Sequence, residues 1–255
     1  MVWIILQLGR RLGVRNFFVH LPTKLYNMTE KEAIIARHSV RQYIDKPIEV
    51  EKIRQLQDLI SECNREGGLH IQLVTDEPNA FSGGLAKYGK FSGISNYIAM
   101  IAKKGDDVNL GYYGEKVVLL AQMLGLSTCW VGLTFRKQPD KYQVFDGEKL
   151  VCVVSLGYGA SQGVQHPQKK GYEAYCKDAR KAPYTFPEWF VDGMKAALLA
   201  PTAINQQKFE FVLHDGNKVE AKIRFTMLNG YAPIDLGIAK CHFEIGAGKE
   251  NFEWL

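Results

Sequence analysis

The chain has 255 residues, of which 46% are hydrophobic and 23% charged, proportions that are typical of a globular protein and argue against disorder. This length accommodates one large domain or two small ones. The net charge of +5 comes from scattered lysines and arginines. It therefore argues against a nucleic-acid-binding protein and favours a small anionic ligand.

Cysteine usage and the first residues bear on the cellular compartment. The five cysteines show no Cys-x-x-Cys or Cys/His ligand spacing, so we expect free thiols, a reducing cytoplasmic setting and no metal site. The apolar start precedes Arg10-Arg11, the reverse of a secretory signal, and is too short to span a membrane. We expect residues 1–27 to be a flexible extension or an over-called start, or alternatively an arm that wraps a partner subunit.

Apolar spacing predicts an alternation of helices and strands in the first half of the chain. Thr29 and Glu32 form a capping box at the start of a short helix. Helices are expected at 30–36, 49–63 and 115–124, strands at 69–73, 97–102, 127–133 and 150–156, and a surface loop at 82–95.

A polar, basic stretch at 163–181 marks the best boundary between two parts of the chain. Beyond it we expect helices at 187–200 and 234–245 and a hairpin around Asp215-Gly216-Asn217. The pattern predicts an α+β fold with a mainly antiparallel sheet flanked by helices. We expect a first lobe at 28–165, a connector at 166–186 and a second, shorter lobe at 187–255.

The second lobe echoes the first. Adding 138 to a residue number places Leu56 on Met194 and Leu73 on Phe211, with apolar side chains at equivalent points of a helix and the following strand. This pattern suggests an internal duplication.

The segment from Arg37 to Tyr43 carries the first candidate site. Arg37, Ser39 and Arg41 alternate, so in an extended segment they project to one side, next to His38. Guanidinium groups make paired hydrogen bonds to phosphate oxygens. The segment therefore indicates a phosphate site, with a solvated basic turn as the alternative.

A second candidate segment follows an apolar helix rich in alanine. Pro201 ends that helix, and Thr202, Asn205 and Gln207 then present a hydroxyl and two amides. The small residues permit close approach of a flat ring. The alternative is an ordinary helix end followed by a loop.

Together these segments resemble the nitroreductase family of FMN-dependent oxidoreductases, which shows an Arg-x-Ser-x-Arg start and an Ala-Pro-Ser-x-x-Asn-x-Gln segment. Ser127-Thr-Cys-Trp-Val-Gly132 and Val153-Val-Ser-Leu-Gly157-Tyr158 are also similar to the family's strands. The resemblance covers roughly 28–170 and 187–211. Lys208-Phe209 stands where the family usually has Pro-Trp, which puts any wall formed by those residues in doubt.

The resemblance implies one FMN site and no catalytic side chain, because the chemistry occurs on the flavin. Backbone of Gly132 and Leu133 would lie near its reactive edge, although a structural role for Leu133 and Gln207 is an equal alternative. The cofactor-binding residues implied by the family are Arg37, His38, Ser39, Arg41, Gly132, Leu133, Lys169, Lys170, Pro201, Thr202, Asn205 and Gln207.

The chain departs from the family in how the two motifs are distributed. An ordinary member is a homodimer whose subunits each carry both motifs, whereas here each lobe carries one. Cys63 stands in the first lobe where the second has Pro201. The resemblance therefore implies a pseudo-dimer of two lobes that mimics the homodimer, with one live site and one dead one. We expect a monomer, with further association open.

The family chemistry is a ping-pong transfer of hydride through flavin N5. It implies an NADH- or NADPH-oxidising reductase of nitroaromatic, quinone or similar small-molecule acceptors, with no nucleic-acid or membrane partner. One alternative is a flavin-binding protein without turnover. Another is an offshoot of the family with other flavin chemistry, such as dehalogenation or flavin fragmentation, for which the loop at 81–93 is the candidate lid.

Overall fold

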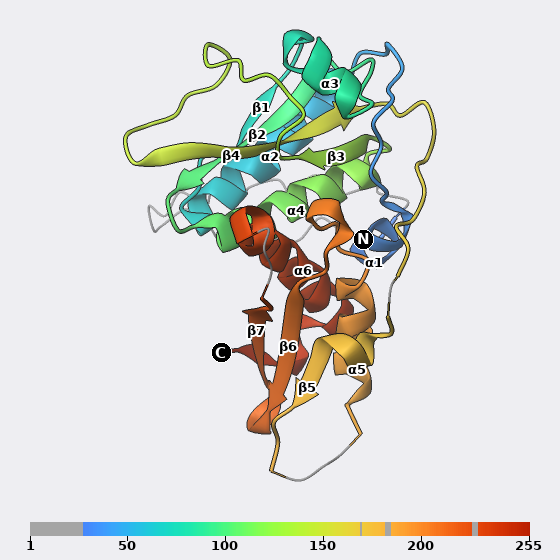
Figure 1. Ribbon diagram of the computed structural model, residues 1–255, viewed down its shortest axis with the longest axis vertical. Helices are drawn as coiled ribbons and strands as arrows, with labels where there is room; N and C mark the ends of the chain where they lie inside the picture. Colours follow the sequence, from blue (N-terminus) through green and yellow to red (C-terminus); the bar gives the residue numbers. More distant parts are fainter. Residues whose placement is uncertain (1–27, 169, 182–184, 226–228) are drawn as a thin grey trace, which may run out of the picture.

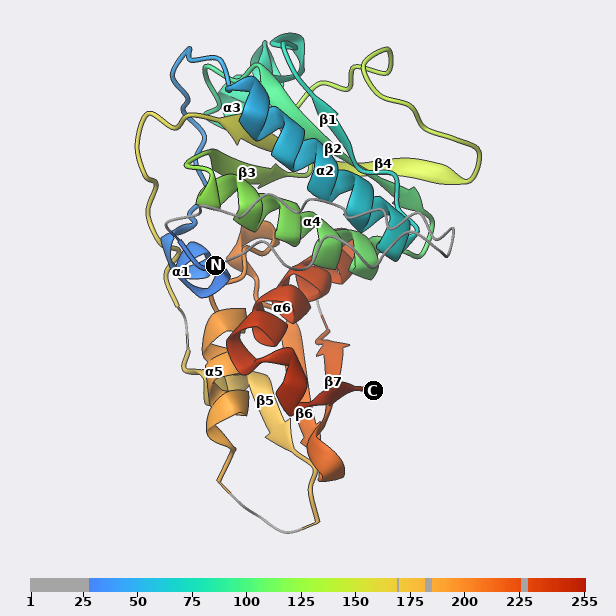
Figure 2. The ribbon, with the colours of Figure 1, turned by 180° about the vertical axis from the view of Figure 1, so that it is seen from behind.

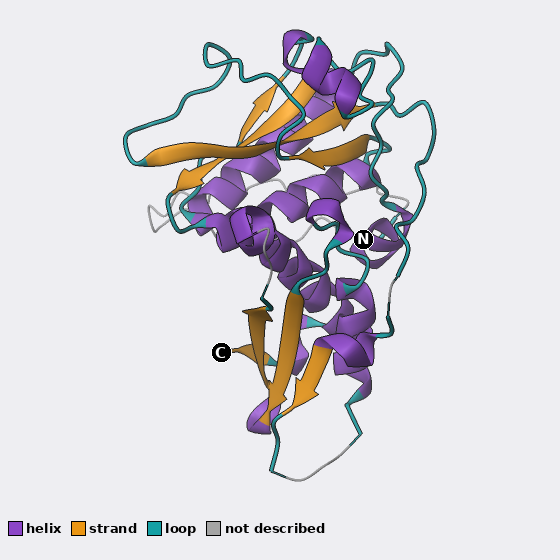
Figure 3. Ribbon diagram, in the orientation of Figure 1, coloured by secondary structure: helices purple, strands orange, loops and turns teal. Residues whose placement is uncertain are grey.

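Two four-stranded sheets lie at opposite ends of the molecule with helices between them (Figures 1 and 3). This computed structural model describes residues 28–168, 170–181, 185–225 and 229–255. The first sheet has the order β1-β2-β4-β3, formed by Gln72–Val74, Asn96–Lys103, Glu148–Gly157 and Ser127–Val131, and is antiparallel throughout. The second has the order β5-β6-β7-β8, formed by Cys176–Asp178, Phe209–His214, Lys218–Ile223 and Glu253–Trp254.

Six α-helices occur in the described part of the chain, joined in places by short 3-10 turns: α1 Glu30–Ala36, α2 Val50–Gly67, α3 Gly84–Tyr88, α4 Asp107–Met123, α5 Glu188–Ala197 and α6 Ala232–Ala247. The predicted capping box of α1 is present. Glycine ends α2, where Gly68 has a φ of 63°, a conformation that glycine adopts readily. None of the helices in the described ranges is long and apolar enough to cross a membrane.

The observed elements confirm the predicted α+β alternation and the hairpin at 215–217, with four differences. Helix α4 begins at Asp107, before the apolar run that predicted it, and the loop at 82–95 contains α3. The sheets are less uniformly antiparallel than expected, because β5 pairs with β6 and β7 with β8 in parallel. Strand β5 lies within the predicted connector, so the connector contributes an edge to the second sheet. The predicted extension at 1–27 lies outside the described residues.

Each lobe contains the same order of helix, strand, strand, helix (Figure 2). The first lobe has α2, β1, β2 and α4, and the second has α5, β6, β7 and α6. The two strands are antiparallel neighbours in both cases. A long link at 75–95 joins the strands of the first lobe, whereas the turn at Asp215–Asn217 joins those of the second. This difference explains why one sequence offset matches only the helix and the first strand.

The lobes meet where α4 and α6 cross at two glycines. A Cβ atom on Gly111 would lie 2.2 Å from the carbonyl oxygen of Ile234, and one on Gly237 would lie 2.0 Å from that of Val108. The two contacts are reciprocal, because Ile234 lies three residues before Gly237 and Val108 lies three residues before Gly111. No side chain larger than hydrogen fits at either position without moving a helix.

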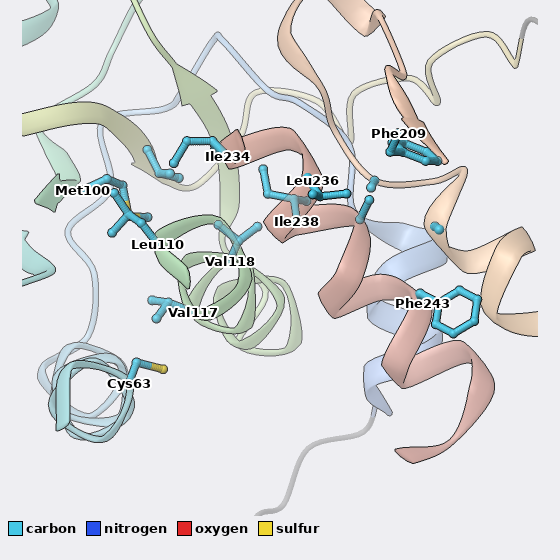
Figure 4. Close-up of a cluster of buried hydrophobic side chains, with 14 of the residues drawn as sticks. Cys63, Met100, Leu110, Val117, Val118, Phe209, Ile234, Leu236, Ile238 and Phe243 are labelled. Carbon is cyan, nitrogen blue, oxygen red and sulfur yellow. The ribbon is translucent and has the colours of Figure 1, made fainter. Parts of the chain in front are cut away.

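The hydrophobic cluster with the most residues runs through this crossing (Figure 4). Leu110 and Val118 of α4 and Ile238 of α6 lie in it, fully or almost fully buried. On the far side of α6, the ring of Phe243 stacks on that of Phe211 with centroids 4.7 Å apart. Residues of both parts of the chain therefore share this cluster.

Replacing Gly237 by alanine tests the crossing. The added methyl group meets backbone of α4, so we expect the free energy of unfolding to fall by about 1–3 kcal/mol or more. The midpoint of urea unfolding measures the change. Gly84→Ala is the matched control, because a Cβ there has open space around it. Equal midpoints for the two variants would contradict the contact.

Candidate functional site

The segment that follows α1 is extended and lies beside β3. The backbone N–H of Val40 donates to Thr128 O at 3.0 Å, and Ser39 forms a parallel bridge to the same residue. Val40 and Tyr43 are buried in the core of the first lobe. Val40 therefore faces the core, whereas Ser39 and Arg41 on either side of it are exposed.

Several side chains of this segment act on the thiol of Cys129 in β3. Burial raises the pKa of Cys129, and the charge of Arg41 together with side-chain hydrogen bonds from Arg41 and Ser39 opposes that rise. The charge of Arg37 acts on the same thiol. All three residues thus act on one thiol, although Arg37 is buried and Ser39 and Arg41 are exposed. Their projection to one side stays a prediction. His38 beside them is half-buried.

The loop after Pro201 has an unusual backbone. Ile204, Asn205 and Gln207 have φ angles of 47°, 53° and 46°. This left-handed region is disfavoured for residues other than glycine, and most of all for a β-branched one such as Ile204. Each such residue costs on the order of 1–3 kcal/mol and persists only where its surroundings hold it.

A buried carboxylate holds the strained loop. Asp235, in the first turn of α6, accepts the backbone N–H of Ala203 at 2.9 Å and Nε2 of Gln206 at 2.8 Å. Burial raises the pKa of Asp235 to about 6, although both hydrogen bonds favour its charged form. Asp235 was not among the predicted site residues, and its acidic side chain in an apolar helix is the signal that points to it.

Two predicted site residues build the loop itself. The hydroxyl of Thr202 accepts the backbone N–H of Gln207 at 3.1 Å. The buried side chain of Gln207 donates to Leu198 O at 3.0 Å and accepts from the hydroxyl of Tyr175 at 3.3 Å. The structure thus gives Gln207 a structural role, one of the two roles expected for it.

The stretch from Gly163 to Pro167 joins the two candidate segments. A Cβ on Gly163 would lie 2.9 Å from Cβ of His38, while Pro167 O accepts Nδ2 of Asn205 at 3.0 Å. Between them, Nε2 of His166 lies 2.9 Å from Leu198 O. Burial lowers the pKa of His166, and the nearby charge of Arg37 lowers it further. The structure therefore brings the Arg37 segment and the Pro201 loop to the two ends of one short stretch.

Arg37 belongs to a buried polar cluster between the lobes. Its Nε lies 3.6 Å from Oε1 of Glu115, and Nε and Nη1 are buried without a hydrogen-bond partner among the described residues. Glu115 is fully buried and accepts Nε1 of Trp130 at 2.8 Å. Its Oε1 lies 2.9 Å from Nε2 of His242, whose Nδ1 lies 3.1 Å from Ala196 O.

Sequence reasoning missed Glu115 and His242. Both lie in strongly apolar helices, α4 and α6, where a charged or titratable side chain is rarely buried without a partner. That signal was available in the sequence, but the pairing joins residues of different lobes, and helical spacing cannot reveal such a contact.

The remaining predicted residues lie around the end of β3 and the connector. A Cβ on Gly132 would lie 2.5 Å from the ring of Tyr231, whose hydroxyl donates to Gly132 O at 3.0 Å. The small size of Gly132 is thus required by a tyrosine of the second lobe, a residue that sequence reasoning also missed. The side chain of Leu133 is 74% exposed, and Lys170 is exposed. Lys169 lies outside the described residues.

The loop at 81–93 is anchored to the first lobe. Phe81 and Phe91 are buried, with ring centroids 5.3 Å apart, and Phe81 also contacts the rings of Tyr97 and Phe135. Opening this loop as a lid would expose four aromatic side chains, so the packing does not favour such a motion.

Replacing Asp235 by asparagine tests the carboxylate that holds the loop. Because its pKa is raised to about 6, its favourable contribution is present in full below about pH 4 and is lost as the pH rises through 6. We expect the difference in unfolding free energy between wild type and Asp235→Asn to change by up to about 3 kcal/mol across this window. Urea unfolding at pH 4, 5, 6 and 7 measures it. The exposed Asp192→Asn is the control, and a pH-independent difference for both variants would contradict the assignment.

Comparison with known proteins places these features in a family. The sequence matches the family described as "Putative TM nitroreductase" over residues 29–247. A solved structure described as a "putative nitroreductase" from Thermotoga maritima is 21% identical, with a TM-score of 0.61, covering 89% of this chain and 87% of that chain. At this identity the likeness shows the fold.

Other similar structures cover less of the chain. An FMN-dependent nitroreductase from Clostridium difficile is 17% identical with a TM-score of 0.42, covering 60% of this chain and 98% of that one. Nitroreductase A from Vibrio parahaemolyticus is 14% identical with a TM-score of 0.47, covering 63% and 78%. None of the curated proteins matches the chain. The match over 29–247 includes most of both lobes, and the chain accordingly belongs to this nitroreductase family.

Proposed function

We propose that the protein is an FMN-dependent oxidoreductase that takes hydride from NADH or NADPH and reduces nitroaromatic, quinone or similar electron-poor acceptors. The observation that carries the proposal is Arg37. It is a buried guanidinium with two N–H-bearing nitrogens that lack hydrogen-bond partners among the described residues, beside Ser39 and Arg41. Membership of the nitroreductase family supports the same chemistry.

The donor set fits the phosphate of FMN. Arginine provides paired N–H donors for phosphate oxygens, and hydrogen bonds between charged groups are about twice as strong as neutral ones. In our proposal Arg37, Ser39 and Arg41 hold the phosphate, with His38 next to the ribityl chain. Lys169 and Lys170, which belong to the connector sequence, would add positive charge near the phosphate, as the family resemblance implies.

The loop from the second lobe fits a flat ring. Pro201, Thr202 and Ala203 are small, and hydrogen bonds within the protein fix the strained turn after them. We infer that this loop contacts the isoalloxazine through Pro201, Thr202 and Asn205. In our proposal, backbone of Gly132 and Leu133 would lie near the reactive edge of the flavin. FMN, when bound, supplies hydride acceptance and donation at N5, while the protein positions the reactants and sets the local charge.

We further propose that the two lobes mimic the subunits of a homodimer and form one FMN site per chain. The repeated helix–strand–strand–helix order and the reciprocal glycine contact support a pseudo-twofold relation. The second site is inactive in this proposal. Helix α2 continues through Cys63 to Gly67, whereas α5 ends before the strained loop that carries Pro201.

The wider setting is also a proposal. We infer a cytoplasmic monomer that acts on small molecules without a nucleic-acid or membrane partner. The five cysteines are free, which supports a reducing compartment.

Binding of flavin without turnover is a second candidate. Tyr231 favours it, because its ring lies against Gly132 at the position proposed for the reactive edge. The offshoot chemistries gain no such support, since the loop at 81–93 is anchored by its aromatic packing.

The absorbance spectrum of the purified protein tests the proposal. We expect a yellow protein with one FMN per chain that bleaches when NADH or NADPH is added. Colour that persists with either nucleotide would favour the non-turnover alternative. Colourless protein that takes up no added FMN would contradict the proposed function, and two FMN per chain would contradict the single site.

Replacing Arg41 by alanine tests the phosphate contact. We expect Arg41→Ala to lose flavin on gel filtration, because a charged donor to the phosphate is removed. Arg65→Ala is the matched control, since Arg65 is an exposed arginine in the last turn of α2. Equal retention, or equal loss, by the two variants would argue against the assignment.

A further inference from the structure

We propose that Glu115 and His242 form a positioning pair that keeps the charge of Arg37 available to an anionic ligand. The inference rests on the proposed function only for the identity of that ligand. It assigns roles to a carboxylate and an imidazole that lie behind the candidate site and come from different lobes.

The hydrogen-bond geometry of His242 determines where its protons lie. Its Nδ1 lies 3.1 Å from Ala196 O, a carbonyl that can only accept, so Nδ1 carries a proton. Its Nε2 lies 2.9 Å from Oε1 of Glu115. This contact needs one proton between the two atoms, on either the ring or the carboxyl group. The other oxygen of Glu115 accepts from Trp130 at 2.8 Å.

The net charge of the Glu115–His242 pair follows from this proton. With one shared proton, the pair is either an imidazolium and a carboxylate or a neutral imidazole and a carboxylic acid. Its net charge is zero in both cases. Arg37 stays protonated in proteins, so the cluster as a whole carries one uncompensated positive charge.

Arg37 also influences three other groups around it. The groups that its charge acts on include the rings of His38 and His166 and the thiol of Cys129. Burial lowers the pKa of both histidines and raises that of the thiol, which favours the neutral form of each. None of these three groups supplies a counter-anion.

Arg37 also has unused hydrogen-bonding capacity. Its Nε lies 3.6 Å from Glu115, beyond a normal hydrogen bond, and neither Nε nor Nη1 has a partner among the described residues. Leaving such groups unpaired in a buried site is costly. A ligand with oxygen acceptors and negative charge, such as a phosphate monoester, satisfies both the charge and the hydrogen bonds.

A plain salt bridge between Arg37 and Glu115 is the competing account, and variants separate the two. Removing His242 leaves Glu115 as a full countercharge beside Arg37. Removing Glu115 instead, as Glu115→Gln, leaves neutral partners and preserves the charge of Arg37. In a plain salt bridge, only the second change would affect anion binding, and it would strengthen it.

Titration of the flavin-free full-length chain with FMN and with riboflavin tests the pair, because the two ligands differ by the phosphate. Quenching of flavin fluorescence gives both dissociation constants. For His242→Phe we expect FMN affinity to fall about tenfold or more, as for loss of a charged interaction, while riboflavin affinity stays within about twofold. Glu115→Gln keeps the wild-type ratio of FMN to riboflavin affinity, and the double variant His242→Phe/Glu115→Gln restores it.

Controls exclude a purely structural effect. Phe243→Leu, next to His242, is expected to lower the melting temperature without changing the FMN-to-riboflavin ratio. An unchanged ratio in His242→Phe, or no recovery in the double variant, overturns the proposal.

A second measurement is independent of flavin. We expect inorganic phosphate to raise the melting temperature of the wild type and of Glu115→Gln, but to do so much less for His242→Phe. If phosphate shows this pattern and FMN does not bind, the pair is supported and the proposed function fails. If phosphate stabilises all three proteins equally or none of them, the positioning pair itself is overturned.

Discussion

The close approach of α4 and α6 is the constraint on which the rest of the structure depends. At Gly111 and Gly237 each helix backbone fills the space that a side chain would occupy. This contact fixes both the distance between the helices and their register. Glu115 lies one turn beyond Gly111, and His242 lies little more than one turn beyond Gly237. The register that the glycines impose therefore brings these two side chains together at the interface, where they contact at 2.9 Å.

Helix α6 organises both halves of the candidate site. Asp235 in its first turn holds the strained loop after Pro201, and His242 further along faces Glu115 and the Arg37 side. The cost of the left-handed residues 204, 205 and 207 is offset by hydrogen bonds of the loop, including those to Asp235 and Thr202. A change in the position of α6 would therefore disturb the loop after Pro201 and the surroundings of Arg37 together.

The sequence predicted what depends on local spacing. Apolar periodicity identified most helices and strands, and the capping box of α1 is present as expected. What it missed depends on contacts between distant residues. The parallel edge strands β5 and β8, the tyrosine over Gly132 and the Glu115–His242 pair each join segments that are far apart in the chain. The left-handed backbone of Ile204 could not be predicted locally either. That conformation is disfavoured for a β-branched residue and depends on its tertiary contacts.

The contact between Gly111 and Gly237 also allows the Glu115–His242 pair to be compared with its proposed pseudo-symmetric counterpart. Under the proposed pseudo-twofold relation, Gly111 corresponds to Gly237, so Glu115 corresponds to Cys241 and Lys116 to His242. The mate of the Glu115–His242 pair is then Cys241 with Lys116, and the charge of Lys116 does act on the buried thiol of Cys241. Burial raises the pKa of that thiol far above its ordinary value, so it holds no charge with which to mimic a carboxylate. In a homodimer both copies of such a pair must be identical, whereas a fused chain allows them to diverge. Under the same proposed relation, the first lobe would also lack a counterpart of the Pro201 loop. Both differences would then be consistent with one ligand site, on the Arg37 side.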